Sequence, residues 1–167
     1  MIRLEFKALS ECPRTKIDFF NSINRIPVST TLGDYVSLPE TIYSRNIFEE
    51  NFVEFRFDKD TKDLYEITLV AIDKDYVNIS ENSLNHYCNG YHLCKIIEEE
   101  SVLEDLLPMA IEKFQNSVKF QFDFVDVKTE TLFCIGSNVY VGVNSKSFLT
   151  CVILSGLSED EIFSIFG

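Results

Sequence analysis

Two histidines and two cysteines lie within nine residues, in the segment HYCNGYHLC that spans positions 86–94. Imidazole and thiolate groups are the ligands that zinc prefers, so this segment is a candidate metal site. Structural zinc sites usually contain two cysteines separated by about two to four residues, and this segment has no such pair. The potential ligands are His86, Cys88, His92 and Cys94.

Two local structures fit this segment. In the first, Asn89-Gly90 forms the turn of a β-hairpin, which places the first histidine and cysteine on one face and the second pair on the other. In the second, Ser80 caps a short helix that ends at Gly90. The four side chains diverge in both structures. We therefore expect buried thiols and packed rings here, and no metal, cofactor or Cys–His catalytic pair.

Two other patterns resemble metal sites. Residues 58–66, DKDTKDLYE, resemble a calcium loop, but Asp63 stands where such a loop needs glycine, and we expect a solvated hairpin turn. The pairs Glu5-x-Lys7 and Asp126-x-Lys128 resemble the acid–lysine pairs of metal-dependent nucleases. Such an enzyme also needs a further acid and a basic groove. A metal-dependent phosphodiester hydrolase is therefore kept as an alternative.

The elements that would position these residues include several strands. Alternating apolar and polar residues predict strands, and short polar turns favour antiparallel neighbours. The expected strands cover residues 2–8, 53–58, 64–72, 118–124, 131–135, 139–143 and 148–154.

Three helices are expected beside these strands. Helical spacing of apolar residues predicts one over 15–26 and another over 101–115, with a kink at Pro108. A capping box at Ser158-Glu-Asp-Glu161 opens a short C-terminal helix. Residues 27–51 show no clear period and are expected to form a long connection with a short helix near Pro39. The sequence thus predicts one α+β domain over 1–167, with a predominantly antiparallel sheet of about five to seven strands.

The net charge of the chain limits the classes of molecule that we expect it to bind. Its 27 acids and 15 bases give a net charge of −12, which opposes binding to nucleic-acid backbones or anionic membranes and permits a basic protein partner. The first residues, MIRLEFKALSE, contain no continuous apolar segment, so we expect no secretory signal, and no apolar run of the sequence is long enough to span a bilayer. The five cysteines are an odd, irregularly spaced set, so we expect reduced thiols and a cytoplasmic location.

Acidic residues mark two candidate partner-binding surfaces. Residues 98–112 carry six acids and no base, which suits either the N-terminus of a helix or a docking surface for a cationic partner. The candidates in and beside this segment are Glu98, Glu99, Glu100, Glu104, Asp105, Tyr87 and Tyr91. The second candidate group is Asp58, Asp60 and Asp63.

In its size, acidity, α+β layout and absence of catalytic motifs, the chain resembles the immunity proteins of bacterial toxin–immunity pairs, including those of contact-dependent growth inhibition. This resemblance implies a non-catalytic cytoplasmic protein that occludes the active or substrate-binding site of one cognate toxin, often a nuclease. An exposed sheet edge that accepts a strand from the partner is another mode of binding. A second alternative is an acidic nucleic-acid mimic that inhibits a DNA-binding protein. The oligomeric state stays open.

Overall fold

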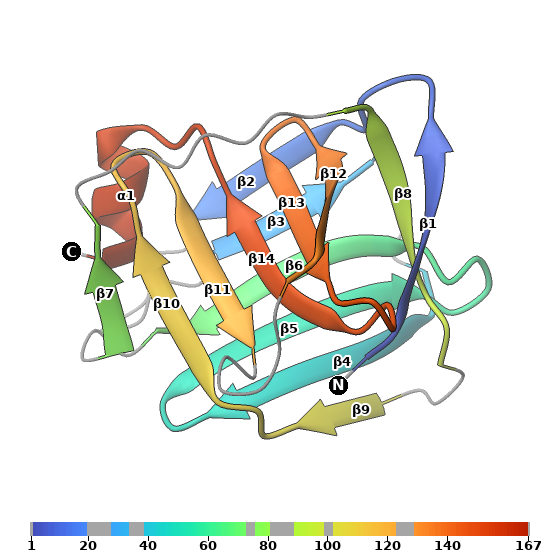
Figure 1. The fold of residues 1–167 in the computed structure, drawn as a ribbon, viewed down its shortest axis with the longest axis horizontal. Helices are drawn as coiled ribbons and strands as arrows, with labels where there is room; N and C mark the ends of the chain where they lie inside the picture. Colours follow the sequence, from blue (N-terminus) through green and yellow to red (C-terminus); the bar gives the residue numbers. More distant parts are fainter. Residues whose placement is uncertain are drawn as a thin grey trace.

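The structure is a computed structural model that describes residues 2–19, 28–33, 39–72, 76–80, 89–98, 102–122 and 129–166. Within these ranges the chain forms strands β1 to β14 and one helix, α1 (Figure 1). The strands form one sheet of eight and one of six.

The eight-stranded sheet contains the first and the last strand of the described chain. Most of its neighbouring strands are antiparallel, whereas β12 pairs in parallel with β8, and β10 with β7. Across the sheet the order is β1 (Leu4–Leu9), β8 (Tyr91–Ile96), β12 (Thr131–Gly136), β13 (Val139–Val143), β14 (Leu149–Leu154), β11 (Val118–Phe122), β10 (Met109–Lys113) and β7 (Val77–Ile79).

The six-stranded sheet is drawn from the first part of the chain and one later strand. Its strands are antiparallel except for the parallel pair β4 and β9. Across the sheet the order is β2 (Thr15–Phe19), β3 (Val28–Leu32), β6 (Leu64–Ala71), β5 (Asn51–Asp58), β4 (Thr41–Phe48) and β9 (Val102–Asp105).

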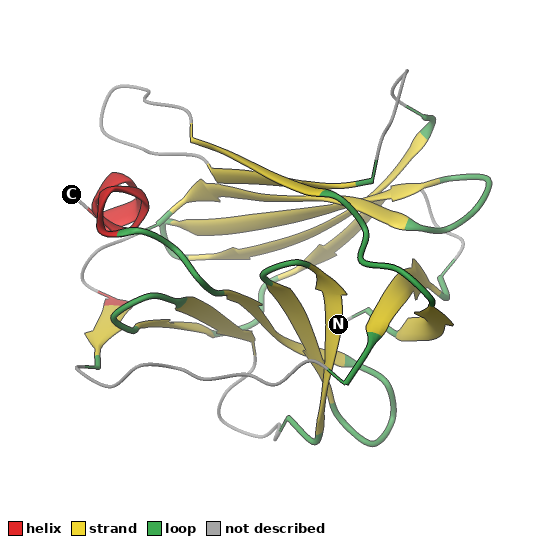
Figure 2. Cartoon of the chain, turned by 90° about the horizontal axis from the view of Figure 1, so that it is seen from above, coloured by secondary structure: helices red, strands yellow, loops and turns green. Residues whose placement is uncertain are grey.

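The two sheets pack face to face as two layers, with helix α1 (Glu159–Phe166) at one end (Figure 2). One apolar cluster contains residues of both sheets. The rings of Phe55 on β5 and Phe122 on β11 meet edge to face, with their centroids 5.9 Å apart. Phe57 and Phe120 are fully buried in this core. Each such phenylalanine contributes about 1.5–3 kcal/mol through its removal from water.

Several expectations are confirmed. Strands are present where alternation predicted them around residues 2–8, 53–58 and 118–124, and the hairpin turns between β5 and β6 and between β12 and β13 fall where expected. The C-terminal capping box also forms. Glu161 N donates to Ser158 Oγ (3.2 Å), and Ser158 N donates to Glu161 Oε2 (2.7 Å).

The predicted α+β class with three helices is wrong, because the described chain is mostly β-sheet with one short helix. Residues 15–19 of the expected N-terminal helix form β2, where Lys16 and Asp18 alternate with apolar or hydroxyl residues and β3 supplies the hydrogen bonds. Residues 20–27 lie outside the described ranges. The number of strands also exceeds the predicted five to seven.

The expected middle helix over 101–115 is replaced by β9 and β10. Pro108 stands between these strands and removes a helical hydrogen bond, while pairing with β4 and β11 satisfies the backbone on either side. Residues 27–51, expected to be a connection, contain β3 and β4. Ser44 and Asn46 are buried polar residues on the inward face of β4, so the usual apolar alternation was hidden.

α1 is the one helix in the described ranges, and with its eight residues it is too short to cross a bilayer.

Candidate functional site

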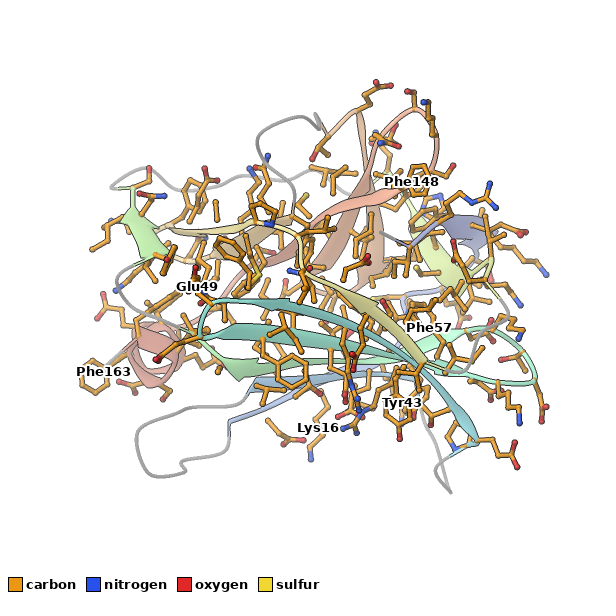
Figure 3. All side chains as sticks on the ribbon, turned by 90° about the horizontal axis from the view of Figure 1, so that it is seen from below. Lys16, Tyr43, Glu49, Phe57, Phe148 and Phe163 are labelled. Atoms are coloured by element: carbon orange, nitrogen blue, oxygen red, sulfur yellow. The ribbon has the colours of Figure 1, made fainter. Side chains whose placement is uncertain are left out.

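The outward face of the six-stranded sheet carries a cluster of charged and aromatic side chains. Along β4 and β5, Ile42, Val53, Phe55 and Phe57 are buried in the core, so their neighbours point outward. Figure 3 shows Tyr43 and Lys16 projecting from this sheet on the side away from the other layer. We term the cluster the open face, and its members are Tyr43, Arg45, Glu54, Arg56 and Glu66.

Strand register brings the open face together. Tyr43 on β4 lies opposite Arg56 on β5, and Arg45 lies opposite Glu54. On the other side of β5, Arg56 lies opposite Glu66 on β6. Directly opposed side chains on one face of a sheet are close enough to interact. Three consecutive antiparallel strands thus bring the cluster together.

A shared carboxylate holds the two arginines. Arg45 Nε and Arg56 Nε each donate to Glu54, at 2.7 Å to Oε2 and 2.7 Å to Oε1 respectively. Arg56 Nη1 also donates to Glu66 Oε2 at 2.8 Å. Although Glu54 points outward, its side chain is only 6% exposed, because these partners cover it. The arginine side chains are each 32% exposed and remain accessible at their outer sides.

The ring of Tyr43 completes the cluster. The guanidinium carbons of Arg45 and Arg56 lie 5.1 and 5.8 Å from its centroid, within the range of cation–π attraction. The hydrogen bond to Glu54 raises the pKa of Arg45. Burial alone would lower the pKa of Arg56, but the hydrogen bond to Glu54 and the charge of Glu66 raise it overall. Both guanidinium groups are therefore cations at neutral pH.

The open face continues onto the edge strand β9. Arg45 lies opposite Glu104, with Nη1 and Oε1 3.6 Å apart, and the Glu104 side chain is 57% exposed. Tyr43 lies opposite Val102, which is 49% exposed. Asn46 holds the chain just after β9, since its Nδ2 donates to Leu107 O (3.1 Å) and its Oδ1 accepts from Leu107 N (3.0 Å).

The acids predicted between 98 and 105 do not form one surface among the described residues. Glu104 adjoins the open face, whereas Asp105 lies beside Ser44 and Asn46 at a small pocket on the other side of β9. Glu98 follows β8 in the other sheet, where it accepts a hydrogen bond from Arg3 N at 3.0 Å. Glu99 and Glu100 lie outside the described residues.

The second acidic group forms the turn between β5 and β6. Asp58 Oδ1 accepts hydrogen bonds from the backbone of Asp60 (2.8 Å) and Thr61 (3.0 Å). Asp63 pairs with Lys95 at 2.9 Å. Asp60 is exposed. These carboxylates shape a hairpin turn, as predicted, and no group of three or more possible metal ligands occurs in the described ranges.

Only part of the HYCNGYHLC segment is described, because His86, Tyr87 and Cys88 lie outside the described residues. On β8, burial and the charge of Asp63 raise the pKa of the Cys94 thiol. His92 packs edge-on against Phe133, with centroids 5.0 Å apart. Tyr91 packs against a small cluster on the outer side of the eight-stranded sheet. These contacts are those of packed rings and a buried thiol.

The structure describes only one of the two acid–lysine pairs. Glu5 and Lys7 are both exposed on β1, whereas Asp126 and Lys128 lie outside the described residues. No third acid joins Glu5 and Lys7 in a metal-ligand group within the part of the chain that is described.

Sequence reasoning did not find the open face. Alternation along 53–58 placed Glu54 and Arg56 outward, but their partners Tyr43 and Arg45 lay in a region with no predicted strand. One local signal was available, because Tyr43, Arg45 and Ile47 alternate with the inward residues of β4. These inward residues are Ile42, Ser44 and Asn46, and the last two are polar, which obscured the pattern of a strand.

Fold and site together define a two-sheet β protein whose smaller sheet presents an ordered, charged and aromatic face. A comparison of the sequence with known proteins finds no matching family and no matching curated protein.

Proposed function

We propose that this chain is a non-catalytic cytoplasmic binding protein that neutralises a cognate basic toxin, for example a nuclease, by occluding its active or substrate-binding site. The observation that carries the proposal is the open face, where Glu54 and Glu66 hold two arginines on an outward sheet surface and both guanidinium groups lie near the ring of Tyr43.

The composition of the open face suits a protein partner. Tyrosine and arginine are among the residues that most often dominate the energy of protein–protein interfaces. Here the hydrogen bonds to Glu54 fix both guanidinium groups before any partner binds. Side chains that are ordered in advance lose less entropy on association, so more of the contact energy appears as affinity.

The charge of the whole chain favours a basic partner. A net charge of −12 accelerates encounter with a cationic protein and repels nucleic acid. Glu104 supplies an exposed carboxylate at the margin of the open face. The acids of the open face alternate with arginines, and this pattern does not support a mimic of nucleic-acid phosphates.

The proposal is tested by co-expression with the product of the adjacent upstream gene. We expect one complex in size-exclusion chromatography and rescue of growth if the neighbour is toxic. Tyr43→Ala should weaken binding about 30-fold or more, as for a hot-spot residue, without loss of the fold. Phe163→Ala, which removes an exposed aromatic ring on α1 outside the open face (Figure 3), is the matched control and should bind like the wild type.

Two results would overturn the proposal. One is separate elution of the two proteins together with a harmless neighbour. The other is a complex that Tyr43→Ala leaves at full affinity while its thermal unfolding is unchanged. The second result would move the docking surface away from the open face.

A further inference from the structure

On the outward side of the six-stranded sheet, directly opposed residues of neighbouring strands form rows that end at the edge strand β9. One row crosses β6, β5, β4 and β9 through Thr68, Glu54, Arg45 and Glu104. Its charges alternate in sign from Glu54 onward. Opposite charges on directly opposed residues stabilise a sheet, whereas like charges destabilise it. The next position in this row, beyond β9, therefore favours a cation.

The neighbouring row ends differently. It passes through Glu66, Arg56, Tyr43 and Val102 in the same four strands. Tyr43 is aromatic, and Val102 is 49% exposed at the edge. The next position in this row favours an apolar side chain, because such a residue would cover Val102 and remove its surface from water.

The edge that carries both row ends is ordered and outermost. β9 is the last strand of its sheet among the described residues, and Figure 1 shows it at the margin of the molecule. Asn46 fixes the backbone just beyond it through two hydrogen bonds to Leu107. Leu106, between β9 and this anchor, is 75% exposed. An outermost strand of this kind can pair with a strand from another chain.

We propose that β9 accepts an extended segment of the basic partner as a seventh strand of this sheet. A lysine or arginine of that segment pairs with Glu104, and an apolar residue two positions away covers Val102. This inference rests on the proposed function and specifies how the partner binds. The added strand extends the sheet that carries the open face by one strand beyond β9.

A second copy of this chain fits the edge poorly. If two β9 strands paired antiparallel with their outward faces on the same side, Glu104 would face either Val102 or Glu104 of the other copy. No cation would meet Glu104, and the Glu104 carboxylates of the two copies would lie diagonally or directly opposite each other. Each copy also carries a charge of −12. The charges at this edge therefore select a basic segment.

The test uses a capped peptide, Thr-Val-Thr-Lys-Thr-Val-Thr, which reads the same in both directions and so fits parallel or antiparallel addition. Titration into ¹⁵N-labelled protein should shift the backbone amide signals of Val102–Asp105 in a saturable way. A peptide with glutamate in place of lysine is the control for charge, and it should bind at least about fivefold more weakly.

A charge exchange tests the pairing itself. Glu104→Lys should lower affinity for the lysine peptide and raise it for the glutamate peptide, so that the preference reverses. Glu104 is exposed, so the variant should keep the native amide spectrum apart from local shifts. Asp60→Lys, in the turn between β5 and β6, makes the same change of charge away from β9 and should leave both affinities unchanged.

Backbone pairing is tested with two methylated lysine peptides. One carries methyl groups on the valine and lysine amides, and the other on the threonine amides. One of the two should lose binding, and which one does so reports the direction of the added strand. Binding that survives both modifications, shifts located outside β9, or the absence of any preference reversal would overturn strand addition.

The outcomes separate this inference from the proposed function. If Tyr43→Ala weakens the complex with the toxin while the peptides do not bind β9, neutralisation stands and strand addition fails. If the peptides bind β9 as expected but no toxic partner forms a complex, the edge site stands and toxin neutralisation fails. Dimers in size-exclusion chromatography that Glu104→Lys abolishes would show that a second copy occupies the edge, against the proposal.

Discussion

The two sheets of this protein differ in how they treat their outer faces. In the eight-stranded sheet, every residue of the central strands β13 and β14 is buried, so both faces of these strands are covered. Its outer side carries a small cluster that comprises Cys134, Tyr140, Cys151 and Ile153, packed with Tyr91. In the six-stranded sheet, most outward residues of β4 and β5 are charged or aromatic, and most are half-buried.

This difference indicates which of the two sheets can bind a partner protein on its outer face. Residues on the outer side of β14 contribute to the stability of the fold, whereas those on the outer side of β4 and β5 are held by ion pairs and stay accessible. A long apolar strand such as β14 follows from burial on both faces. An alternating strand with paired charges follows from burial on one face, and its free face is available for binding.

The strongest test of the comparison is a truncation on the outer side of the eight-stranded sheet. Ile153 lies on that side and is 1% exposed. Ile153→Ala should lower the free energy of unfolding by about 2–4 kcal/mol, like a substitution in a main core, because it removes buried methyl groups and leaves a cavity. Urea denaturation followed by circular dichroism measures this loss.

The matched control for Ile153→Ala is Val70→Ala, on the outward side of β6 and half-buried. It should cost clearly less, on the order of 1 kcal/mol or below, since part of its surface already meets water. Equal losses at the two positions would mean that the outer faces of the sheets are alike, and the contrast between them would fail.

The sequence allowed prediction of those strands whose local pattern and tertiary burial agree. Val118, Phe120 and Phe122 alternate with polar residues and are all buried, so β11 was predictable from one segment alone. The run from Leu149 to Leu154 was also predictable, because six consecutive residues are apolar or small and the turns on both sides are clear. The C-terminal helix followed from the reciprocal hydrogen bonds of its capping box.

The remaining elements depend on contacts that a local pattern does not contain. Residues 102–113 carry apolar residues at helical spacing, yet β9 pairs with β4 and β10 pairs with β7, and both of these partners lie far away in sequence. β4 places Ser44 and Asn46 in the interior, where Asn46 binds the backbone of Leu107. The open face was missed for the same reason, since its residues come together only through the pairing of β4 with β5.

A smaller effect is expected from breaking the network of the open face. Glu54→Gln keeps the shape of the side chain but removes the charge shared by Arg45 and Arg56. The free energy of unfolding should fall by about 1–2 kcal/mol, because two partly buried guanidinium groups lose their common carboxylate. Parallel urea titrations of the variant and the wild type measure the difference.

Glu104→Gln is the control for this change, since it also removes one carboxylate from an arginine on the same face. Its pair with Arg45 is longer, at 3.6 Å, and its side chain is 57% exposed, so the change should stay within about 0.5 kcal/mol. A Glu54→Gln variant as stable as the wild type would show that packing alone, without the ion pairs, orders the open face.

Thiol labelling is the most direct probe of the two outer faces. The substitution that it requires should have the smallest effect on stability of those considered. Cys134 and Cys151 lie on the outer side of the eight-stranded sheet and are 4% and 1% exposed. Burial raises the pKa of the Cys151 thiol, although a hydrogen bond from Thr129 lowers it in part. The thiolate is the reactive form, so both cysteines should alkylate slowly at pH 8 in the native protein.

Thr68→Cys places a thiol on the outward side of the six-stranded sheet, next to Glu54, and should change stability by less than about 0.5 kcal/mol. Iodoacetamide labelling followed by peptide mass spectrometry should show the engineered thiol reacting at least about tenfold faster than Cys151. Because both thiols project from the outer side of a sheet, the ratio of their rates depends on what covers each face. Equal rates in the folded protein would mean that the outer side of β14 opens as readily as the open face, and that a partner has two surfaces to choose from.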